Sequence, residues 1–358
     1  MFHPACHNKQ GLCRPAEHSN TNPTLTLSIS HRTIFFAPLD WGFGHTTRSI
    51  PLIRQLATNN KVILGVTPLT APLLEHEFPH LQKLNIEAYN IRYSRYLPVY
   101  LKLLCDWPRI TGIIKKERDQ LQTIISEYAV DMIISDNRPG LYHPNIESIY
   151  ITHQLNIQAG VWSGIANAMH HRYMRHFNRI WVPDTENRQQ SLAGALSHSN
   201  GQTNVQYIGP QSRLRPSLPM GSPIDCLLLL SGPEPQRTIL EHLFLKLFDN
   251  TTKRTVLVRG SADPLGIVPT GKLSVIDLAD ATQLSQLIAD ANVVVCRSGY
   301  SSLMDLHLLN KKQLVLVPTP GQTEQEYLAL HWQKHFGAKI VTQNELLSMH
   351  PDQFTRLL

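Results

Sequence analysis

Residues Val293–Ala329 read VVVCRSGYSSLMDLHLLNKKQLVLVPTPGQTEQEYLA, and they carry the strongest structural signal in the chain. They contain one pattern twice: a short apolar run, a polar turn and an amphipathic segment with helical periodicity. The first run ends in the turn Arg297-Ser298-Gly299, and the second ends in the proline loop Pro318–Gln322. Apolar runs of this length that alternate with amphipathic helices are typical of buried parallel strands joined by helical crossovers. The stretch therefore predicts an α/β domain with a doubly wound parallel sheet.

Polar residues follow each of these predicted strands. In parallel sheets, ligands bind at the carboxyl ends of the strands, next to helix N-termini. Ser298 and Gly299 begin a predicted helix, where backbone N–H groups suit a diphosphate. Asp305 lies two turns further along that helix. The next helix carries Glu324, Gln325 and Glu326 in its first turn, and the oxygens of Gln325 and Glu326 suit sugar or ribose hydroxyls. We therefore expect a ligand that combines a diphosphate with sugar hydroxyls.

This stretch resembles the donor half of GT-B glycosyltransferases, most closely family 28, which includes the MurG-type N-acetylglucosaminyltransferases. The Cys-Arg-Ser-Gly turn at residues 296–299 matches the family without change. Asp305 stands where the family usually has a glutamate for the nucleotide ribose. Gln325 and Glu326 stand for a Gln-Gln pair that binds the donor sugar, and the glutamate changes which sugar hydroxyls would be preferred. The resemblance covers roughly residues 32–345, and it implies transfer of a sugar from a nucleoside diphosphate.

The composition is that of an ordinary globular protein with room for two domains. The chain has 358 residues, is 42% hydrophobic and carries a net charge of +6. The charge fits either a mildly basic cytoplasmic enzyme or attraction to phosphates and an anionic membrane surface. No Cys/His finger or aromatic RNA-binding strand is present in the sequence, which argues against nucleic acid as a partner.

The cysteines and the apolar runs indicate a cytoplasmic location. Five cysteines, an odd number, favour free thiols in a reducing compartment. Cys6 and Cys13 lie among histidines, but their spacing fits no zinc template, so we expect no metal site. The sequence has no apolar run of about 18 residues for a transmembrane helix and no apolar core of a secretory signal at its start.

A second motif follows the first apolar strand of the chain. Gly42 and Gly44 allow positive φ and close backbone approach. The dinucleotide-binding motif Gly-x-Gly-x-x-Gly is incomplete, because Thr47 occupies the position of its third glycine. This disfavours a dehydrogenase. Gly44-His45 with Arg48 resembles the acceptor loop of GT-B enzymes. At a helix N-terminus, His45 should have a lowered pKa. As a neutral imidazole it could take a proton from an acceptor hydroxyl; the alternative is a histidine that only caps the helix.

Two further strand ends point to the same edge of the sheet. Asp136 follows a predicted strand and is expected to orient His45 or to act as the base; the alternative is an aspartate that only forms a turn. His153 follows the next strand, where related enzymes have an acceptor contact. The stretch 93–114 mixes aromatic, basic and apolar residues, which fits either peripheral membrane contact or helices packed on the sheet.

A segment rich in proline and serine divides the chain. We predict a leader at residues 1–31, a first domain at 32–210, a linker at 211–223 and a second domain at 224–358. The second domain begins with a strand that ends in the loop Ser231-Gly232-Pro233-Glu234-Pro235-Gln236-Arg237. In the family that the chain resembles, a glycine-rich loop at this place lies over the donor diphosphate. In this chain the loop keeps one glycine and contains two prolines, which stiffen it. A less characterised GT-B branch has a similar Gly-Pro-Glu-Pro-Gln loop.

The resemblance implies a GT-B fold with two Rossmann-like doubly wound domains facing across a cleft. It further implies an inverting, metal-independent transfer of a hexose or N-acetylhexosamine, with UDP the expected nucleotide, to a hydroxyl on an acceptor that could be lipid-linked. The alternatives are a sugar nucleotide 2-epimerase and a non-catalytic subunit that binds sugar nucleotides. The expected residues are, for catalysis, His45 and Asp136; for the acceptor, Gly42, Gly44, Arg48 and His153; and for the donor, Ser231, Gly232, Gln236, Arg237, Arg297, Ser298, Gly299, Asp305, Gln325 and Glu326.

Overall fold

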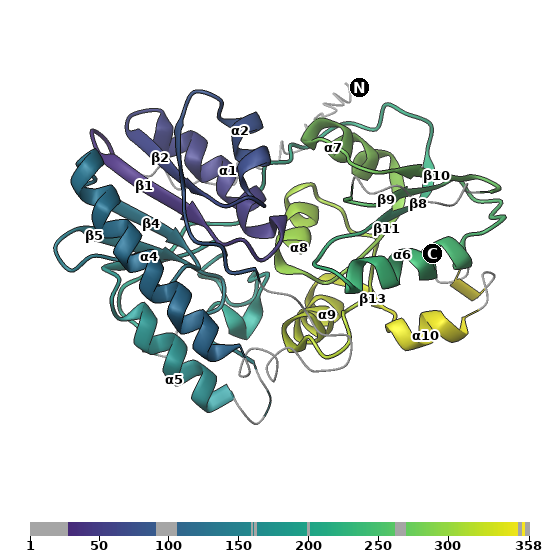
Figure 1. Ribbon diagram of the computed structural model, residues 1–358. Helices are drawn as coiled ribbons and strands as arrows, with labels where there is room; N and C mark the ends of the chain where they lie inside the picture. Colours follow the sequence, from purple (N-terminus) through teal and green to yellow (C-terminus); the bar gives the residue numbers. More distant parts are fainter. Residues whose placement is uncertain are drawn as a thin grey trace, which may run out of the picture.

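The computed structural model describes residues 28–90, 106–158, 160, 163–198, 201–261, 270–349 and 353–354. They form two α/β domains that lie side by side (Figure 1). The first domain has a seven-stranded sheet in the order β3-β2-β1-β4-β5-β6-β7, and the second has a six-stranded sheet in the order β10-β9-β8-β11-β12-β13. Every strand pair in both sheets is parallel, as the apolar runs predict.

The elements alternate along the chain in the manner of doubly wound folds. Those of the first domain are β1 (Thr33–Pro38), α1 (Phe43–Ala57), β2 (Lys61–Val66), α2 (Ala71–Glu77), β3 (Gln82–Asn85), α4 (Trp107–Tyr128), β4 (Met132–Asp136), β5 (Glu147–Ile151), α5 (Ser163–Met174), β6 (Arg179–Val182), the 3₁₀ helix η2 (Gly194–Leu196) and β7 (Val205–Tyr207). Those of the second are β8 (Ile224–Leu229), α6 (Gln236–Leu247), β9 (Thr255–Val258), β10 (Leu273–Ile276), α7 (Ala281–Asp290), β11 (Ala291–Cys296), α8 (Tyr300–Leu308), β12 (Leu314–Leu316), α9 (Thr323–Phe336), β13 (Lys339–Ile340) and α10 (Gln343–Ser348).

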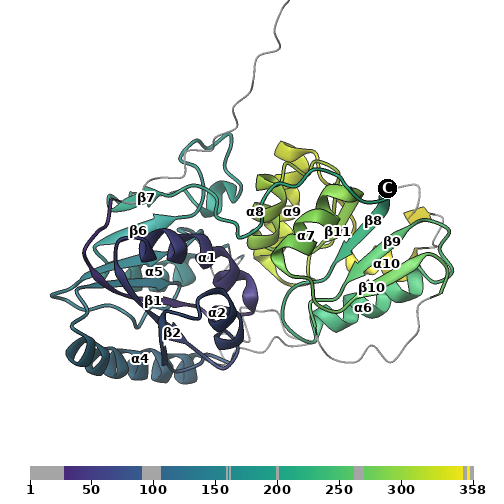
Figure 2. The ribbon, with the colours of Figure 1, turned by 90° about the horizontal axis from the view of Figure 1, so that it is seen from above.

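Both faces of each sheet are covered, which explains why the strands are apolar throughout. Successive side chains of a strand point to opposite faces, so β1 contributes Ile34 to one cluster with α1 and Phe35 to another with α4. Figure 2 shows α1 and α4 on opposite sides of the first sheet. In the second domain, Val294 and Val295 of β11 divide in the same way between two clusters.

The loop between β6 and η2 connects the two domains more closely than the sequence predicts. Leu192, Ala193 and Leu196 belong to the first domain by sequence, but they are fully buried in the core of the second. Asp184 shapes this loop, because its carboxylate accepts hydrogen bonds from the Ser191 hydroxyl at 2.7 Å and from several other donors. The domains therefore meet along α8 and α9, which face the first domain in Figures 1 and 2.

Several predictions fall outside the described residues or differ from the structure. The predicted leader lies mostly before residue 28, and most of the basic and aromatic stretch lies in residues 91–105, which the structure does not describe. The described end of that stretch begins α4, a helix that runs without interruption to Tyr128. Within the described residues, no helix has the length and apolar character needed to cross a membrane. No helix or strand lies between β7 and β8, where the linker is predicted.

A buried ionic network fixes the loops beyond β1 and β4. Arg138 is fully buried and donates to the Glu117 carboxylate at 2.7 Å and to Asp40 at 3.3 Å. Tyr89 donates its hydroxyl to the other Glu117 oxygen at 2.8 Å. Each charge in the network therefore has a partner, as buried charges require.

Gly140 closes this network, and replacing it by alanine is expected to destabilise the protein. A Cβ there would lie 2.5 Å from Glu117 Oε2 and 2.6 Å from the carbonyl oxygen of Ile114. Overpacking of this kind costs about 1–3 kcal/mol. The measurement is the thermal unfolding midpoint. Gly112→Ala is the matched control, since nothing lies within 4 Å of its added Cβ and alanine favours a helix interior. Equal midpoints for Gly140→Ala and the wild type would contradict this account of the loop.

Candidate active site between the two domains

The loop after β1 brings the start of α1 against the second domain. Gly42 has a φ of 78°, which favours glycine, and α1 begins at the next residue. Ser301, from α8, donates its hydroxyl to the Gly44 carbonyl at 3.1 Å. A Cβ at Gly44 would lie 2.9 Å from the Ser301 oxygen. The two predicted acceptor glycines therefore allow a turn and a close interdomain contact.

His45 and Asp136 lie together, as expected for an orienting pair. His45 Nδ1 is 3.0 Å from Asp136 Oδ1. Their proximity follows from the sheet, because β1 and β4 are neighbours and Asp136 pairs in register with Pro38 at the carboxyl ends of both strands. A terminal nitrogen of Arg48, which can only donate, also lies 2.8 Å from Nδ1, but it donates to Asp136 Oδ1 as well. With that donor assigned to Asp136, an unprotonated Nδ1 would set its lone pair against those of the carboxylate, so we assign the proton to Nδ1, which donates it to Asp136. This tautomer leaves the lone pair on Nε2.

Arg48 clamps the same carboxylate. Its Nε donates to Asp136 Oδ2 at 3.1 Å, and its second terminal nitrogen donates to Oδ1. Ser49 adds a hydroxyl donor to Oδ2 at 3.0 Å. Arg48 is only 3% exposed. The guanidinium of Arg48 is therefore enclosed by protein groups and holds Asp136 in place, and its predicted acceptor contact stays a prediction.

The electrostatics of the site keep Asp136 ionised and His45 neutral. Burial opposes ionisation of Asp136, but the charge of Arg48 and the hydrogen bonds from Arg48 and His45 outweigh burial and hold its pKa well below the usual range. Burial is the largest influence on the pKa of His45; together with Arg48 it outweighs the opposing effect of Asp136 and lowers that pKa below 6.5. Among the described residues none hydrogen-bonds to Nε2 of His45. A neutral imidazole with an unoccupied lone pair is the form that a general base requires.

His153 extends this arrangement into the second domain. Arg48 donates to His153 Nδ1 at 3.0 Å, and His153 Nε2 lies 2.9 Å from Glu324 Oε1 at the start of α9. The ring stacks on Tyr300 of α8, with centroids 4.1 Å apart and planes 3° from parallel. Both ring nitrogens thus have protein partners, and the predicted acceptor contact of His153 stays a prediction. We call His45, Arg48, Asp136, His153 and Glu324 the interdomain cluster.

Ser298 and Gly299, which are both predicted to bind the donor, lie at the start of α8. Gly299 is the N-cap residue, and no side chain caps this helix. Helix N-termini without a cap leave backbone N–H groups for an anion. The Ser298 side chain is buried and donates to the carbonyl of Gln325 at 2.7 Å. Any contact of Ser298 with a diphosphate would therefore come from its backbone.

Arg297 lies among protein groups of the second domain. It is 1% exposed and donates to the carbonyls of Val317, Pro318 and Gln236 and to the side chain of Gln343. Burial without a carboxylate partner lowers its pKa to about 10. The guanidinium joins β12, α6 and α10, and it does so through neutral carbonyl and amide oxygens. In the structure Arg297 therefore connects these elements, and its predicted place in the donor site stays a prediction.

The loop after β8 and the start of α6 carry further residues predicted to bind the donor. Arg237 donates to Glu234 and to Glu241, each at 2.6 Å, which satisfies its charge within the protein. The predicted phosphate contact of Arg237 stays a prediction. Gly232 has a φ of 99° and open space around it, and Ser231 is half-buried beside it. Gln236 begins α6, and its side-chain oxygen is buried without a hydrogen-bond partner in the described structure.

Asp305 faces the linker. Its carboxylate accepts a hydrogen bond from Ser212, and burial raises its pKa to about 6 despite that bond and nearby Arg213. Arg213 in turn lies 3.6 Å from Glu77 of α2, so the linker is tied to both domains. A ribose hydroxyl that bound Asp305 would take the place of the Ser212 hydroxyl.

Gln325 and Glu326, the pair predicted to bind the donor sugar, accept hydrogen bonds from the proline loop Pro318–Gln322. Gln325 accepts a hydrogen bond from the Thr319 N–H at 2.9 Å, and Glu326 accepts one from the Gly321 N–H at 2.9 Å. Glu324, one residue earlier, is the side chain that reaches the first domain. Sequence reasoning missed Glu324 and Tyr300, although a glutamate in the first turn of the helix after the proline loop was a usable signal.

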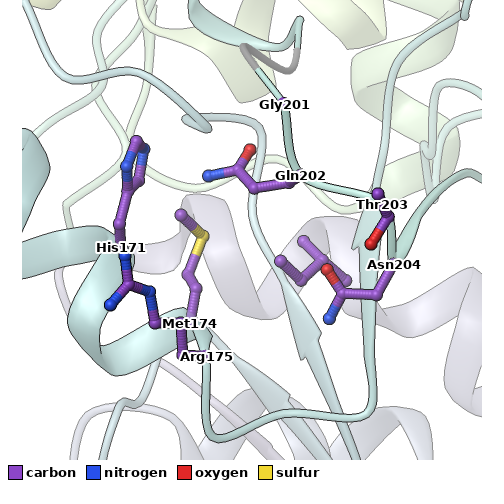
Figure 3. Close-up of a pocket in the computed structure, with 8 residues that line it drawn as sticks. His171, Met174, Arg175, Gly201, Gln202, Thr203 and Asn204 are labelled. Carbon is purple, nitrogen blue, oxygen red and sulfur yellow. The ribbon is translucent and has the colours of Figure 1, made fainter.

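A separate cavity of about 390 Å³ lies in the first domain, between α5 and the segment before β7. Figure 3 shows His171, Met174 and Arg175 on one side and Gly201, Gln202, Thr203 and Asn204 on the other. None of its lining residues belongs to the interdomain cluster. Among the described residues, no group of three or more His, Cys, Asp or Glu side chains is arranged to hold a metal ion.

Comparison with known proteins agrees with this architecture. CalG4, the calicheamicin glycosyltransferase, superimposes with a TM-score of 0.64 at 12% identity, over 92% of this chain and 90% of that one. The chain has the GT-B fold of glycosyltransferases. MurG of Acinetobacter baumannii shares this GT-B fold at a TM-score of 0.53 and 12% identity, over 92% of this chain and 90% of that one.

A third GT-B structure and a family match complete the comparison. The spinosyn rhamnosyltransferase SpnG, solved with thymidine diphosphate, matches at a TM-score of 0.59 and 12% identity, over 91% of each chain. Residues 262–353 match the glycosyltransferase family 28 C-terminal domain. No curated protein matches the chain significantly. The predicted GT-B fold is confirmed, and the predicted resemblance to family 28 is confirmed for the second domain.

Proposed function

We propose that this GT-B protein transfers a hexose or N-acetylhexosamine from a nucleoside diphosphate sugar to an acceptor hydroxyl, with UDP as the nucleotide. The observation that carries the proposal is the His45–Asp136 pair at the start of α1, where Gly44 contacts Ser301 of α8 in the domain that matches family 28. A base on one domain and an anion site on the other is the arrangement that such a transfer needs.

The reaction is a single displacement. The acceptor hydroxyl gives its proton to His45 Nε2 while its oxygen forms a bond to the anomeric carbon of the sugar. The bond between that carbon and the diphosphate oxygen breaks, and the electron pair leaves with the nucleoside diphosphate. Attack from the face opposite the leaving group inverts the anomeric centre. Asp136 holds the Nδ1 proton and stabilises the imidazolium that forms.

The second domain stabilises the leaving group without a metal in this proposal. Backbone N–H groups at Ser298 and Gly299 and the dipole of α8 would face the diphosphate, where negative charge develops. Asp305 would bind the ribose. The thymidine diphosphate bound to SpnG supports a nucleoside diphosphate as the leaving group, although it concerns a different protein.

The acceptor and the place of action remain predictions. SpnG has also been solved with the spinosyn aglycone, an acceptor bound to that protein. For this chain, the net charge of +6 supports attraction to a phosphate-bearing or lipid-linked acceptor at an anionic membrane surface. Vesicle co-sedimentation with and without anionic lipid would test the membrane contact.

Binding of nucleotides is expected to raise the thermal unfolding midpoint of the wild type. A ligand at 100 times its Kd adds about 2.7 kcal/mol of stability. The panel includes UDP, thymidine diphosphate, their sugar conjugates and NAD(P). Asp305→Ala should lose most of the shift, whereas Asp119→Ala, an exposed aspartate of α4, should keep it. A shift with NAD(P) and none with any nucleoside diphosphate would contradict the proposal.

The pH dependence of kcat/KM is expected to show a base with a lowered pKa. Since the pKa of free His45 lies below 6.5, the base is unprotonated at neutral pH, and activity falls only as pH drops through that lowered pKa. The measurement is kcat/KM for transfer across the acidic range. An acidic limb centred well above 6.5 would contradict the assignment of His45 as the base.

A further inference from the structure

Two residues of the second domain hold the ring of His153, which belongs to the first. Tyr300 stacks on one face of the ring. Glu324 approaches its Nε2 at 2.9 Å. The loop that carries His153 is itself fixed, because His170 and His171 of α5 lie at 2.8 and 2.9 Å from the carbonyls of the two residues that follow. The orientation of the ring is therefore set jointly by both domains.

The direction of each hydrogen bond around His153 follows from chemistry. A guanidinium can only donate, so Arg48 donates to His153 Nδ1 and that nitrogen is the acceptor. A neutral ring must then carry its proton on Nε2 and donate it to the Glu324 carboxylate. The acceptor at Glu324 thus selects the tautomer that leaves Nδ1 able to accept from Arg48.

Arg48 connects His153 to the proposed base, His45, through Asp136. With one terminal nitrogen on His153, the other guanidinium nitrogens donate to both oxygens of Asp136, and one of them also lies 2.8 Å from His45 Nδ1. Asp136 in turn accepts the Nδ1 proton of His45. From Glu324 to His45 the chain of hydrogen bonds is unbroken, and every member of it is at least half-buried.

We propose that Glu324 is a positioning residue which, through His153 and Arg48, sets Asp136 against His45, so that the base is aligned only while the second domain is docked on the first. The effect on rate rests on the proposed transfer reaction. Its physical benefit is that proton removal is favoured when the domain bearing the donor is in place, which suppresses unproductive chemistry in the open protein.

The first experiment is ¹⁵N NMR of the full chain with ring-labelled histidine, which requires no substrate. Variants at His45 and His153 assign the two rings. The wild type should show the Nδ1–H tautomer for His45 and the Nε2–H tautomer for His153. Glu324→Ala should give mixed tautomers at His153 and altered ring shifts at His45. Glu324→Gln keeps an acceptor oxygen and should restore most of the wild-type pattern.

The control for this experiment is Glu127→Ala, which removes an exposed carboxylate of α4. It should leave both rings unchanged, and circular dichroism melts should show that all variants are folded. If the tautomer of His153 and the shifts of His45 in folded Glu324→Ala equal those of the wild type, the proposal is overturned.

The second experiment separates positioning from sugar binding. Glu324→Ala should lower kcat for transfer about tenfold or more while the KM for the donor stays close to the wild-type value, and Glu324→Gln should lose less. A raised donor KM with unchanged kcat would show a contact with the sugar and would overturn the proposal. If the wild type transfers no sugar, the proposed function fails, and the NMR result alone decides the hydrogen-bond chain.

Discussion

Replacing His45 by alanine is expected to lower kcat/KM for sugar transfer by about 100- to 10,000-fold, the usual contribution of a general base. The ring is the group in the interdomain cluster that combines a lowered pKa with an unoccupied nitrogen in the described structure. The thermal midpoint should change little, since the ring lies at the edge of the cluster with 14% of its side chain exposed. Steady-state transfer and a melting curve on the same preparation measure both quantities.

The matched control is His76→Ala, which removes an exposed histidine of α2. It should retain wild-type activity within experimental error. Nucleotide binding should survive in both variants, because neither residue belongs to the proposed donor site. A His45→Ala variant that kept activity within threefold of the wild type would show that another group takes the proton.

Replacing Arg138 by methionine is expected to produce the largest loss of stability. Removing one partner of a buried ion pair costs about 3–5 kcal/mol, because the other charge remains buried. In this variant Glu117 would keep the Tyr89 hydroxyl and the Gly140 N–H but no cation. For a domain of this size the thermal midpoint should fall by about 6–20 °C.

The pH dependence of this loss provides a second readout. Burial already raises the pKa of Glu117 in the wild type against the opposing charge of Arg138, so its removal should raise that pKa further. A carboxyl whose folded-state pKa is raised loses stability as pH rises from its unfolded to its folded pKa. The deficit of Arg138→Met should therefore be smaller near about pH 5 than near neutral pH.

The control is Arg172→Met, which removes an exposed arginine of α5. Its midpoint should stay close to that of the wild type. A deficit for Arg138→Met that was below about 1 kcal/mol, or the same at both pH values, would mean that Glu117 is not left charged and buried.

The sequence predicted the sheets well because buried parallel strands leave a direct signal. The apolar run Val293–Cys296 can only be a strand covered on both faces, and it lies within β11. The packing of the loop at Leu192 and Leu196 could not be predicted in this way. Those residues are apolar but have no periodicity, and their partners lie in the second domain, more than 100 positions away, such as Trp332, whose indole donates to the Leu192 carbonyl.

The site was predicted in part for a related reason. His45 and Asp136 follow adjacent strands, and the carboxyl ends of such strands meet at one edge of the sheet. Arg48 and His153 were assigned to the acceptor from the resemblance to GT-B enzymes. Their burial depends on each other and on Glu324, and no pattern in one segment encodes a contact among three segments.

Sequence analysis gave a role to Gln325 and Glu326 but none to Glu324, and the reason is geometric. Successive residues on a helix point about 100° apart, so the rotation of α9 about its own axis decides which of the three residues Glu324, Gln325 and Glu326 faces the other domain. The helix begins at Thr323, which directs Glu324 to His153 and leaves Gln325 on the proline loop. The sequence predicts the start of this helix, but it does not encode how the helix is rotated against the first domain.

Release of nucleoside diphosphate from nucleotide sugars tests the central claim most directly. The wild type is incubated with UDP- and thymidine diphosphate-linked hexoses and N-acetylhexosamines, together with hydroxyl acceptors that include lipid-linked and soluble ones, and His45→Ala is measured in parallel. We predict acceptor-dependent release by the wild type that falls by at least about 100-fold in His45→Ala. Release that is independent of His45, or none from any nucleotide sugar with any acceptor, would contradict it.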